Sequence, residues 1–208
     1  MPGSTAAWAR PLSLGFDLFL AAAFGALQTA SYVYTEAWWL QLLAAGWLAW
    51  RAWVATPGRA FGLGLAYGTA WLVAGTWWLF ISMHRYGGLP AWMAAAAVLG
   101  LAMVLGLYLA AALALFARWR TRRPTADAVL FAALWLLAEL ARGVIFTGFP
   151  WVASGYAHVD SPLAKLAPWI GVYGIGALAA FIAAWVACAW PPVGPRRAVV
   201  IALVALAL

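Results

Sequence analysis

The chain has 208 residues, of which 68% are hydrophobic and only 8% are charged. A soluble domain carries roughly 25% charged residues, so this chain cannot cover a water-facing surface. Its long apolar runs predict membrane-spanning helices, and because they are apolar all round they exclude a transmembrane β-barrel. The net charge of +7 does not indicate a nucleic-acid-binding protein, since the basic residues fall between the apolar runs and form no stripe.

The apolar runs predict an all-α polytopic membrane protein in which residues 1–208 form one helical bundle. We expect six complete spans, at about residues 14–34, 37–54, 60–82, 91–117, 126–146 and 166–190. A seventh run begins near Ala198 and has eleven residues to Leu208. Eleven helical residues rise about 16 Å, so we expect a truncated seventh span. Asp17 and the runs behind it favour an uncleaved first helix over a signal peptide.

The basic residues predict the orientation of these spans. One side of the membrane would hold nine of them, namely Arg10, Arg51, Arg59, Arg118, Arg120, Arg122, Arg123, Arg196 and Arg197. The other side would hold Arg85 and Lys165, with Arg142 near a helix end. Because the side richer in Lys and Arg faces the cytoplasm, we expect a cytoplasmic N-terminus. Residues 84–90 and 143–160 would then face outward together.

Glu139 and Arg142 are the opposite charges that occur within one span at i, i+3, and so share a helix face. Counted from Asp127, they lie about 18 Å and about 22 Å along the helix, in the outer third of the membrane. An intramembrane ionisable pair is by default a candidate functional site, and Arg suits a phospholipid phosphate. The alternative is a structural ion pair, or an arginine that reaches for the headgroups.

The outward segments complete the candidate site. The "TGFPW" segment is expected to break the helix at Gly148 and Pro150, with Phe149 and Trp151 at headgroup level. Irregular backbone at this depth is tolerated where it lines a cavity, so a pocket for an amphipathic molecule competes with an ordinary interfacial loop. We predict that the substrate-binding residues are Arg85, Tyr86, Gly87, Gly88, Glu139, Arg142, Phe149, Pro150, Trp151 and Tyr156.

Other chemistries find little support in the sequence. His84 and His158 have no carboxylate or thiol at metal-ligand spacing, so we expect neither a metal site nor a cofactor. Ser154, His158 and Asp160 are crowded into one loop without a nucleophile elbow, which argues against a hydrolase triad. Cys188 lies in an apolar span and is expected to be an inert small hydrophobe.

Two stretches together carry a family resemblance: "GTWWLFISMHRYGGLPA" (75–91) and "ALWLLAELARGVIFTGFPWVASGYAHVDSPLAKLAPWIGVYG" (133–174). They resemble the membrane domain of bacterial apolipoprotein N-acyltransferases, in order and with similar spacing over about residues 60–190. The first two runs match in general character and lack the early proline-interrupted hairpin of that family. The resemblance implies a multi-pass protein of the bacterial inner membrane that carries a nitrilase-like domain on its periplasmic side.

The resemblance also implies a two-step reaction. A cysteine thiolate takes an acyl chain from a phospholipid, and the N-terminal diacylglyceryl-cysteine of an apolipoprotein then receives it. The Cys, Glu and Lys that act in the family belong to the nitrilase-like domain, which this chain does not contain, so no catalytic residue is expected among residues 1–208. The alternative is a non-catalytic membrane scaffold or a transporter-like module, against which the outer-third position of Glu139 and Arg142 counts.

Overall fold

The computed structural model describes residues 13–189. The expected seventh span, from Ala198 to Leu208, lies outside the described residues. Within residues 13–189 the chain forms helices and connecting loops and contains no strand, which confirms the predicted all-α class.

The helices follow one another with short connections. They are α1 (Leu14–Gln28), α2 (Ala30–Val33), η2 (Thr35–Ala37), α3 (Trp39–Val54), α4 (Pro57–Gly75), α5 (Trp78–Ile81), η3 (Ser82–Tyr86), α6 (Ala91–Trp119), α7 (Pro124–Val144), η4 (Ile145–Thr147), η5 (Ser154–His158), η6 (Pro162–Leu166) and α8 (Ala167–Ala189). Local chemistry sets several boundaries. Pro57 and Pro124 occupy the first helical positions, where a missing N–H costs nothing, and the Thr56 hydroxyl caps α4.

Within residues 13–189, four stretches are long and apolar enough to cross a membrane: Leu14–Val33, Ala91–Trp119, Pro124–Thr147 and Pro162–Ala189. A fifth candidate is the pair Pro57–Gly75 and Trp78–Tyr86, which bend by 54° relative to each other. The span predicted at 37–54 corresponds to α3, which has 16 residues and rises about 24 Å, less than a core of about 30 Å. The described residues therefore confirm a multi-span apolar bundle but not the number six.

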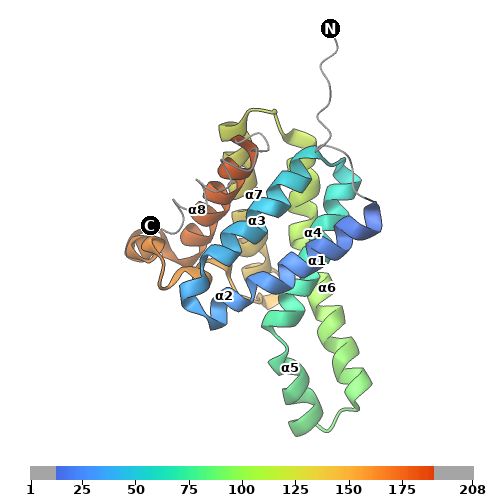
Figure 1. Cartoon of the computed structure of the whole chain (residues 1–208). Coiled ribbons are helices and arrows are strands. Elements are labelled where there is room, and N and C mark those ends of the chain that lie inside the picture. Colours follow the sequence, from blue (N-terminus) through green and yellow to red (C-terminus); the bar gives the residue numbers. More distant parts are fainter. Residues whose placement is uncertain (1–12, 190–208) are drawn as a thin grey trace.

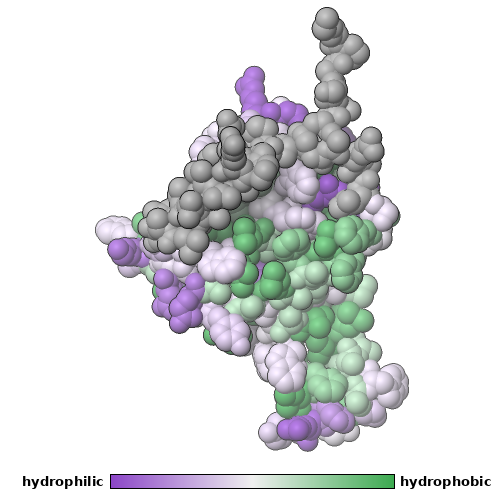
Figure 2. All heavy atoms as spheres, in the orientation of Figure 1, coloured by the Kyte–Doolittle hydropathy of each residue, from purple (hydrophilic) through white to green (hydrophobic). Residues whose placement is uncertain are grey.

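The bend after α4 creates the most distinctive feature of the shape. In Figure 1, α5, η3 and the N-terminal part of α6 form a hairpin that projects from the bundle, and we call this hairpin the arm. With 29 residues, α6 is about 43 Å long, more than a hydrocarbon core requires. We call the end of the bundle that carries the arm the arm end, and the end that carries residues 118–123 the opposite end. Figure 2 shows apolar side chains over the visible face between hydrophilic patches at these two ends.

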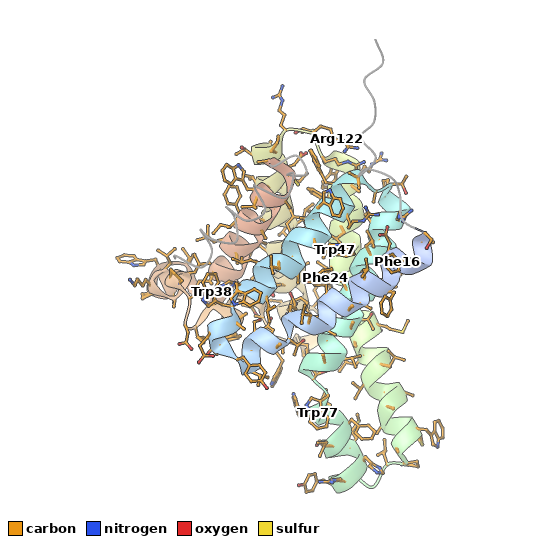
Figure 3. All side chains as sticks on the ribbon, in the orientation of Figure 1. Phe16, Phe24, Trp38, Trp47, Trp77 and Arg122 are labelled. Atoms are coloured by element: carbon orange, nitrogen blue, oxygen red, sulfur yellow. The ribbon has the colours of Figure 1, made fainter. Side chains whose placement is uncertain are left out.

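The core of the bundle combines aromatic stacking with close helix contacts. Trp71 of α4 stacks on Trp135 of α7 at 5.9 Å, and Phe24 of α1 stacks on Trp47 of α3 at 4.8 Å (Figure 3). A Cβ at Gly64 would lie 2.8 Å from the Cα of Ala110, so only glycine lets α4 approach α6 this closely. Small residues at such a contact let two apolar helices pack closely.

A buried ion network ties three helices at the opposite end. The Asp17 carboxylate of α1 is fully buried and accepts hydrogen bonds from Arg51 of α3 at 2.6 Å and from Arg59 of α4. Asp17 also stands in the first turn of α1, where the helix dipole favours an anion. This network explains how a charged residue is tolerated in the first apolar run.

Candidate functional site

Glu139 and Arg142 occupy the last two turns of α7, at the arm end of the bundle. Their side chains are each 4% exposed, and Nη2 of Arg142 lies 3.6 Å from Oε1 of Glu139. The i, i+3 spacing thus produces the shared face that the sequence predicts. Both charged groups are buried, so each needs further polar partners to offset its desolvation.

The Glu139 carboxylate finds its partners in the loop that follows α7, residues 145–161. Oε1 accepts the backbone N–H of Ser154 at 2.7 Å, and Oε2 accepts the Ser154 hydroxyl at 2.9 Å. The indole N–H of Trp135 donates to the same hydroxyl at 3.1 Å. A Cβ at Gly176 of α8 would lie 2.2 Å from the Ser154 hydroxyl oxygen, so glycine leaves the room that this contact needs. Glu139 therefore fixes the second half of the loop.

Arg142 holds the first half of the same loop. Its Nη1 donates to the carbonyl of Trp151 at 2.6 Å and to that of Phe149 at 3.3 Å, while the Phe149 N–H returns a bond to the Arg142 carbonyl at 2.7 Å. The guanidinium also lies over the ring of Trp71, 5.4 Å from its centroid. Together the two charges act as a clamp on residues 149–154, which is the structural alternative that the sequence left open.

The clamped loop has an unusual backbone. Phe146, Thr147 and Val152 have positive φ angles of 55°, 71° and 53°, and Gly148 has 80°. Positive φ is costly for residues with a Cβ and persists only where surrounding contacts enforce it. The helix was predicted to break at Gly148 and Pro150, but α7 ends at Val144, before the glycine, because Ile145 already adopts an extended backbone with φ −69° and ψ 139°.

A second anchor fixes the far end of the loop. His158 is fully buried, and its Nε2 is hydrogen-bonded to the side-chain oxygen of Gln41 on α3. Burial lowers the pKa of the His158 imidazole from 6.5 to about 4, so the ring is neutral at neutral pH. Asp160 instead accepts the Thr35 hydroxyl. Ser154, His158 and Asp160 thus take three different partners and form no relay.

The contact between Trp151 and Trp78 links this loop to the base of the arm. The ring of Trp151 lies 5.2 Å from that of Phe149 and 6.5 Å from that of Trp78 on α5. Val152 packs against Gly75, where a Cβ would come within 2.7 Å of its Cγ1. Pro150, Trp151 and Tyr156 are exposed while the residues between them turn inward, so the loop presents an aromatic surface at the arm end.

The predicted residues of the other segment lie at the tip of the arm. Tyr86 is 84% exposed, and Arg85, Gly87 and Gly88 are exposed with it. Residues within the tip are hydrogen-bonded to one another. His84 Nδ1 is hydrogen-bonded to the Leu89 carbonyl at 2.8 Å, and Gly88 has a positive φ of 68°. Among residues 13–189, no hydrogen bond or ring contact joins the tip to the 145–161 loop. The structure brings Glu139, Arg142, Phe149 and Trp151 together, but not the tip.

An open cleft of about 290 Å³, which includes the solvent space at its mouth, lies beside the charged pair, between α4, α6 and α7. Glu139 and Arg142 line it together with apolar side chains that include Trp71 and Tyr108. Sequence reasoning did not select Trp71 or Tyr108. Their positions could have identified them. Both aromatic residues lie in the middle of predicted spans and not at the interface, where aromatic anchors gather.

Known proteins are similar to this chain in sequence. The family model described as the apolipoprotein N-acyltransferase N-terminal domain matches residues 24–185. The chain belongs to the apolipoprotein N-acyltransferase family. An apolipoprotein N-acyltransferase of Verminephrobacter eiseniae is 51% identical over 183 residues, which cover 82% of this chain and 34% of that protein. One from Ralstonia nicotianae is 46% identical over 186 residues, covering 87% of this chain and 36% of that protein.

The matches to the apolipoprotein N-acyltransferases confirm the resemblance and define its extent. The chain spans about a third of the length of these relatives. It carries their N-terminal domain, which is the segment that forms the bundle and both parts of the candidate site. This coverage is consistent with a catalytic domain that lies elsewhere in the complete proteins.

Proposed function

We propose that this chain is the membrane domain of an acyltransferase that moves an acyl chain from a phospholipid to the N-terminal diacylglyceryl-cysteine of an apolipoprotein. The family match over residues 24–185 is the observation that supports this most directly. The complete protein would act in the bacterial inner membrane. Its nucleophile would be supplied by a domain that follows the membrane bundle, because Cys188 is buried within α8 at the opposite end.

In this proposal, residues 1–208 form a single membrane domain with the N-terminus in the cytoplasm. Its six spans include α3 and the bent pair of α4 and α5, with a seventh in the run from Ala198. The excess of Arg near residues 118–123 supports the orientation, because the positive-inside rule places that end in the cytoplasm. The arm and the 145–161 loop would then lie on the periplasmic side, where phospholipid and lipoprotein meet.

The bundle would position lipid and perform no bond-making step. Phe149, Pro150, Trp151 and Tyr156 would form the floor of the acyl-transfer site, held in place by Glu139 and Arg142. Arg85, Tyr86, Gly87 and Gly88 would contact lipid from the tip of the arm, where a cation and an exposed ring match a phosphate and the headgroup region. A fixed floor favours transfer because correctly placed reactants need less ordering in the transition state.

The test is acyl transfer by the complete gene product reconstituted in phospholipid vesicles. Mass spectrometry of an added diacylglyceryl-cysteine peptide should detect a third acyl chain, and the protein should pass through a thioester intermediate. Arg142→Ala should slow thioester formation, because the floor loses its anchor. Failure of the wild-type protein to acylate the peptide, with solute flux through the vesicles in its place, would favour the transporter-like alternative.

A further inference from the structure

The opposite end of the bundle carries four arginines within six residues, at positions 118, 120, 122 and 123, in the last turn of α6 and the connection to α7. We call residues 118–123 the basic loop. Arg118, Arg122 and Arg123 are exposed, and so is Trp119. Figure 3 shows Arg122 at this end, far along the molecule from Trp77 near the base of the arm. The acyl-transfer proposal assigns no role in lipid binding or acyl transfer to this loop.

The basic loop is held in one conformation. The Asp127 carboxylate accepts the backbone N–H of Thr121 at 2.6 Å and that of Arg122 at 2.8 Å, and also the indole N–H of Trp53 at 2.6 Å. Arg122 has a φ of 66°, a conformation that these bonds enforce. The loop is therefore a preformed surface and differs from a flexible polybasic tail.

Two of the guanidinium groups are themselves fixed. Arg122 lies over the ring of Trp53, 5.5 Å from its centroid, and its Nη1 donates to the Trp53 carbonyl at 2.7 Å. Arg120 donates to the Ala117 carbonyl through Nη1, while its buried Nε has no hydrogen-bond partner. Partial burial lowers the pKa of Arg120, the charge of Arg122 lowers it further, and the Asp127 carboxylate opposes this shift.

The chain offers these four arginines little counter-charge. It has five acidic residues, and at this end only Asp17 and Asp127 occur. Asp17 binds Arg51 and Arg59, and Asp127 is occupied by backbone and indole N–H groups. Among residues 13–189, no ion pair involves an arginine of the basic loop, and residues 1–12 and 190–208 contain no Asp or Glu. Four arginines therefore face one carboxylate, Asp127, and the preformed surface keeps a net positive charge that favours an external anion.

We propose that the basic loop is a binding site for the phosphate of an anionic phospholipid in the adjacent leaflet. The loop joins two membrane-spanning helices, so its guanidinium groups lie where headgroups lie. Arginine pairs with phosphate through a planar fork of donors, and Trp119 adds an interfacial aromatic ring beside it. Clustered Arg next to a span attracts anionic lipid, by an amount that corresponds to roughly a fivefold gain in affinity for each charge.

The test uses the complete gene product in nanodiscs of phosphatidylcholine with increasing phosphatidylglycerol, and native mass spectrometry counts bound phosphatidylglycerol. The double variant Arg118→Gln/Arg123→Gln removes two side chains that make no hydrogen bond in the structure, and should weaken binding roughly 25-fold. Arg118→Lys/Arg123→Lys preserves the charge and should retain most of the binding. Lys165→Gln removes one charge at the arm end and should change nothing.

A second variant tests the preformed geometry at constant charge. Trp53→Leu removes the platform under Arg122 and a donor to Asp127, and should weaken phosphatidylglycerol binding several-fold with the membrane topology unchanged. Equal binding by the double Gln variant and the wild-type protein would overturn the proposal. Competition by millimolar inorganic phosphate as effective as that by phosphatidylglycerol would also overturn it, because the site would then recognise free phosphate and not a lipid.

Discussion

The 145–161 loop and the tip of the arm are both irregular segments rich in Gly and aromatic residues, yet the bundle treats them in opposite ways. The loop is clamped by two buried charges from α7 and anchored by His158 to α3. The tip is closed by bonds between its own residues, with Tyr86 84% exposed. Sequence composition alone does not distinguish a segment that tertiary contacts hold in place from one that projects into its surroundings.

This difference has a thermodynamic meaning. The loop contains three non-glycine residues at positive φ, each of which costs on the order of 1 kcal/mol or more and must be offset by tertiary contacts. The tip places its positive φ at Gly88, where the cost is small. Removing a tertiary contact should therefore release the loop, whereas the tip should tolerate substitution without loss of stability.

The largest expected effect comes from Glu139→Ala. The change removes two bonds to Ser154 and leaves the buried Arg142 without its counter-charge, which should destabilise the bundle by about 3–5 kcal/mol. Thermal unfolding of the complete gene product in detergent measures the loss, and limited proteolysis should show new cleavage within residues 145–161. Ser154→Ala is the matched control and should cost less, since the backbone bond to Glu139 remains. Equal stability of Glu139→Ala and the wild-type protein would contradict the clamp.

The second effect is the pH dependence conferred by His158. Its folded pKa of about 4 lies below the ordinary 6.5, so the released loop binds a proton that the docked loop does not. The stabilisation is complete above pH 6.5 and is lost as the pH falls from about 6.5 to about 4, by up to about 3 kcal/mol. Melting temperatures measured across this range should fall less steeply for His158→Gln, which keeps a polar partner for Gln41. Parallel curves for the two proteins would argue against this assignment.

A third effect separates the charge of Arg142 from its geometry. Lysine keeps the positive charge beside Glu139 but cannot reach two carbonyls and an indole face with a planar fork. Arg142→Lys should cost about 2 kcal/mol, and the thioester yield of the complete gene product should fall because Trp151 is less firmly placed. Stability and thioester yield measured in the same preparations test this. A variant that loses stability but keeps full thioester yield would assign Arg142 a purely structural role.

The sequence predicted those features that depend on composition and periodicity. The all-α class, most helix positions, and the shared face of Glu139 and Arg142 all follow from spacing along a helix. It did not predict the bend after Gly75, the end of α7 at Val144, or the engagement of Arg142 with loop carbonyls. These features depend on contacts between residues far apart in the chain, such as Val152 with Gly75, which no local pattern encodes.

The smallest effect is expected at the tip of the arm, and it sharpens the comparison most. Tyr86→Ala removes a side chain that is 84% exposed, so unfolding should change by less than about 0.5 kcal/mol. If the tip contacts lipid as proposed, the same variant should raise the phospholipid concentration needed for half-maximal acyl transfer. Phe at this position serves as the matched control, because it keeps the ring and removes only the hydroxyl. Unchanged stability with unchanged transfer would remove the tip from the site and leave the 145–161 loop as the part of the bundle that receives lipid.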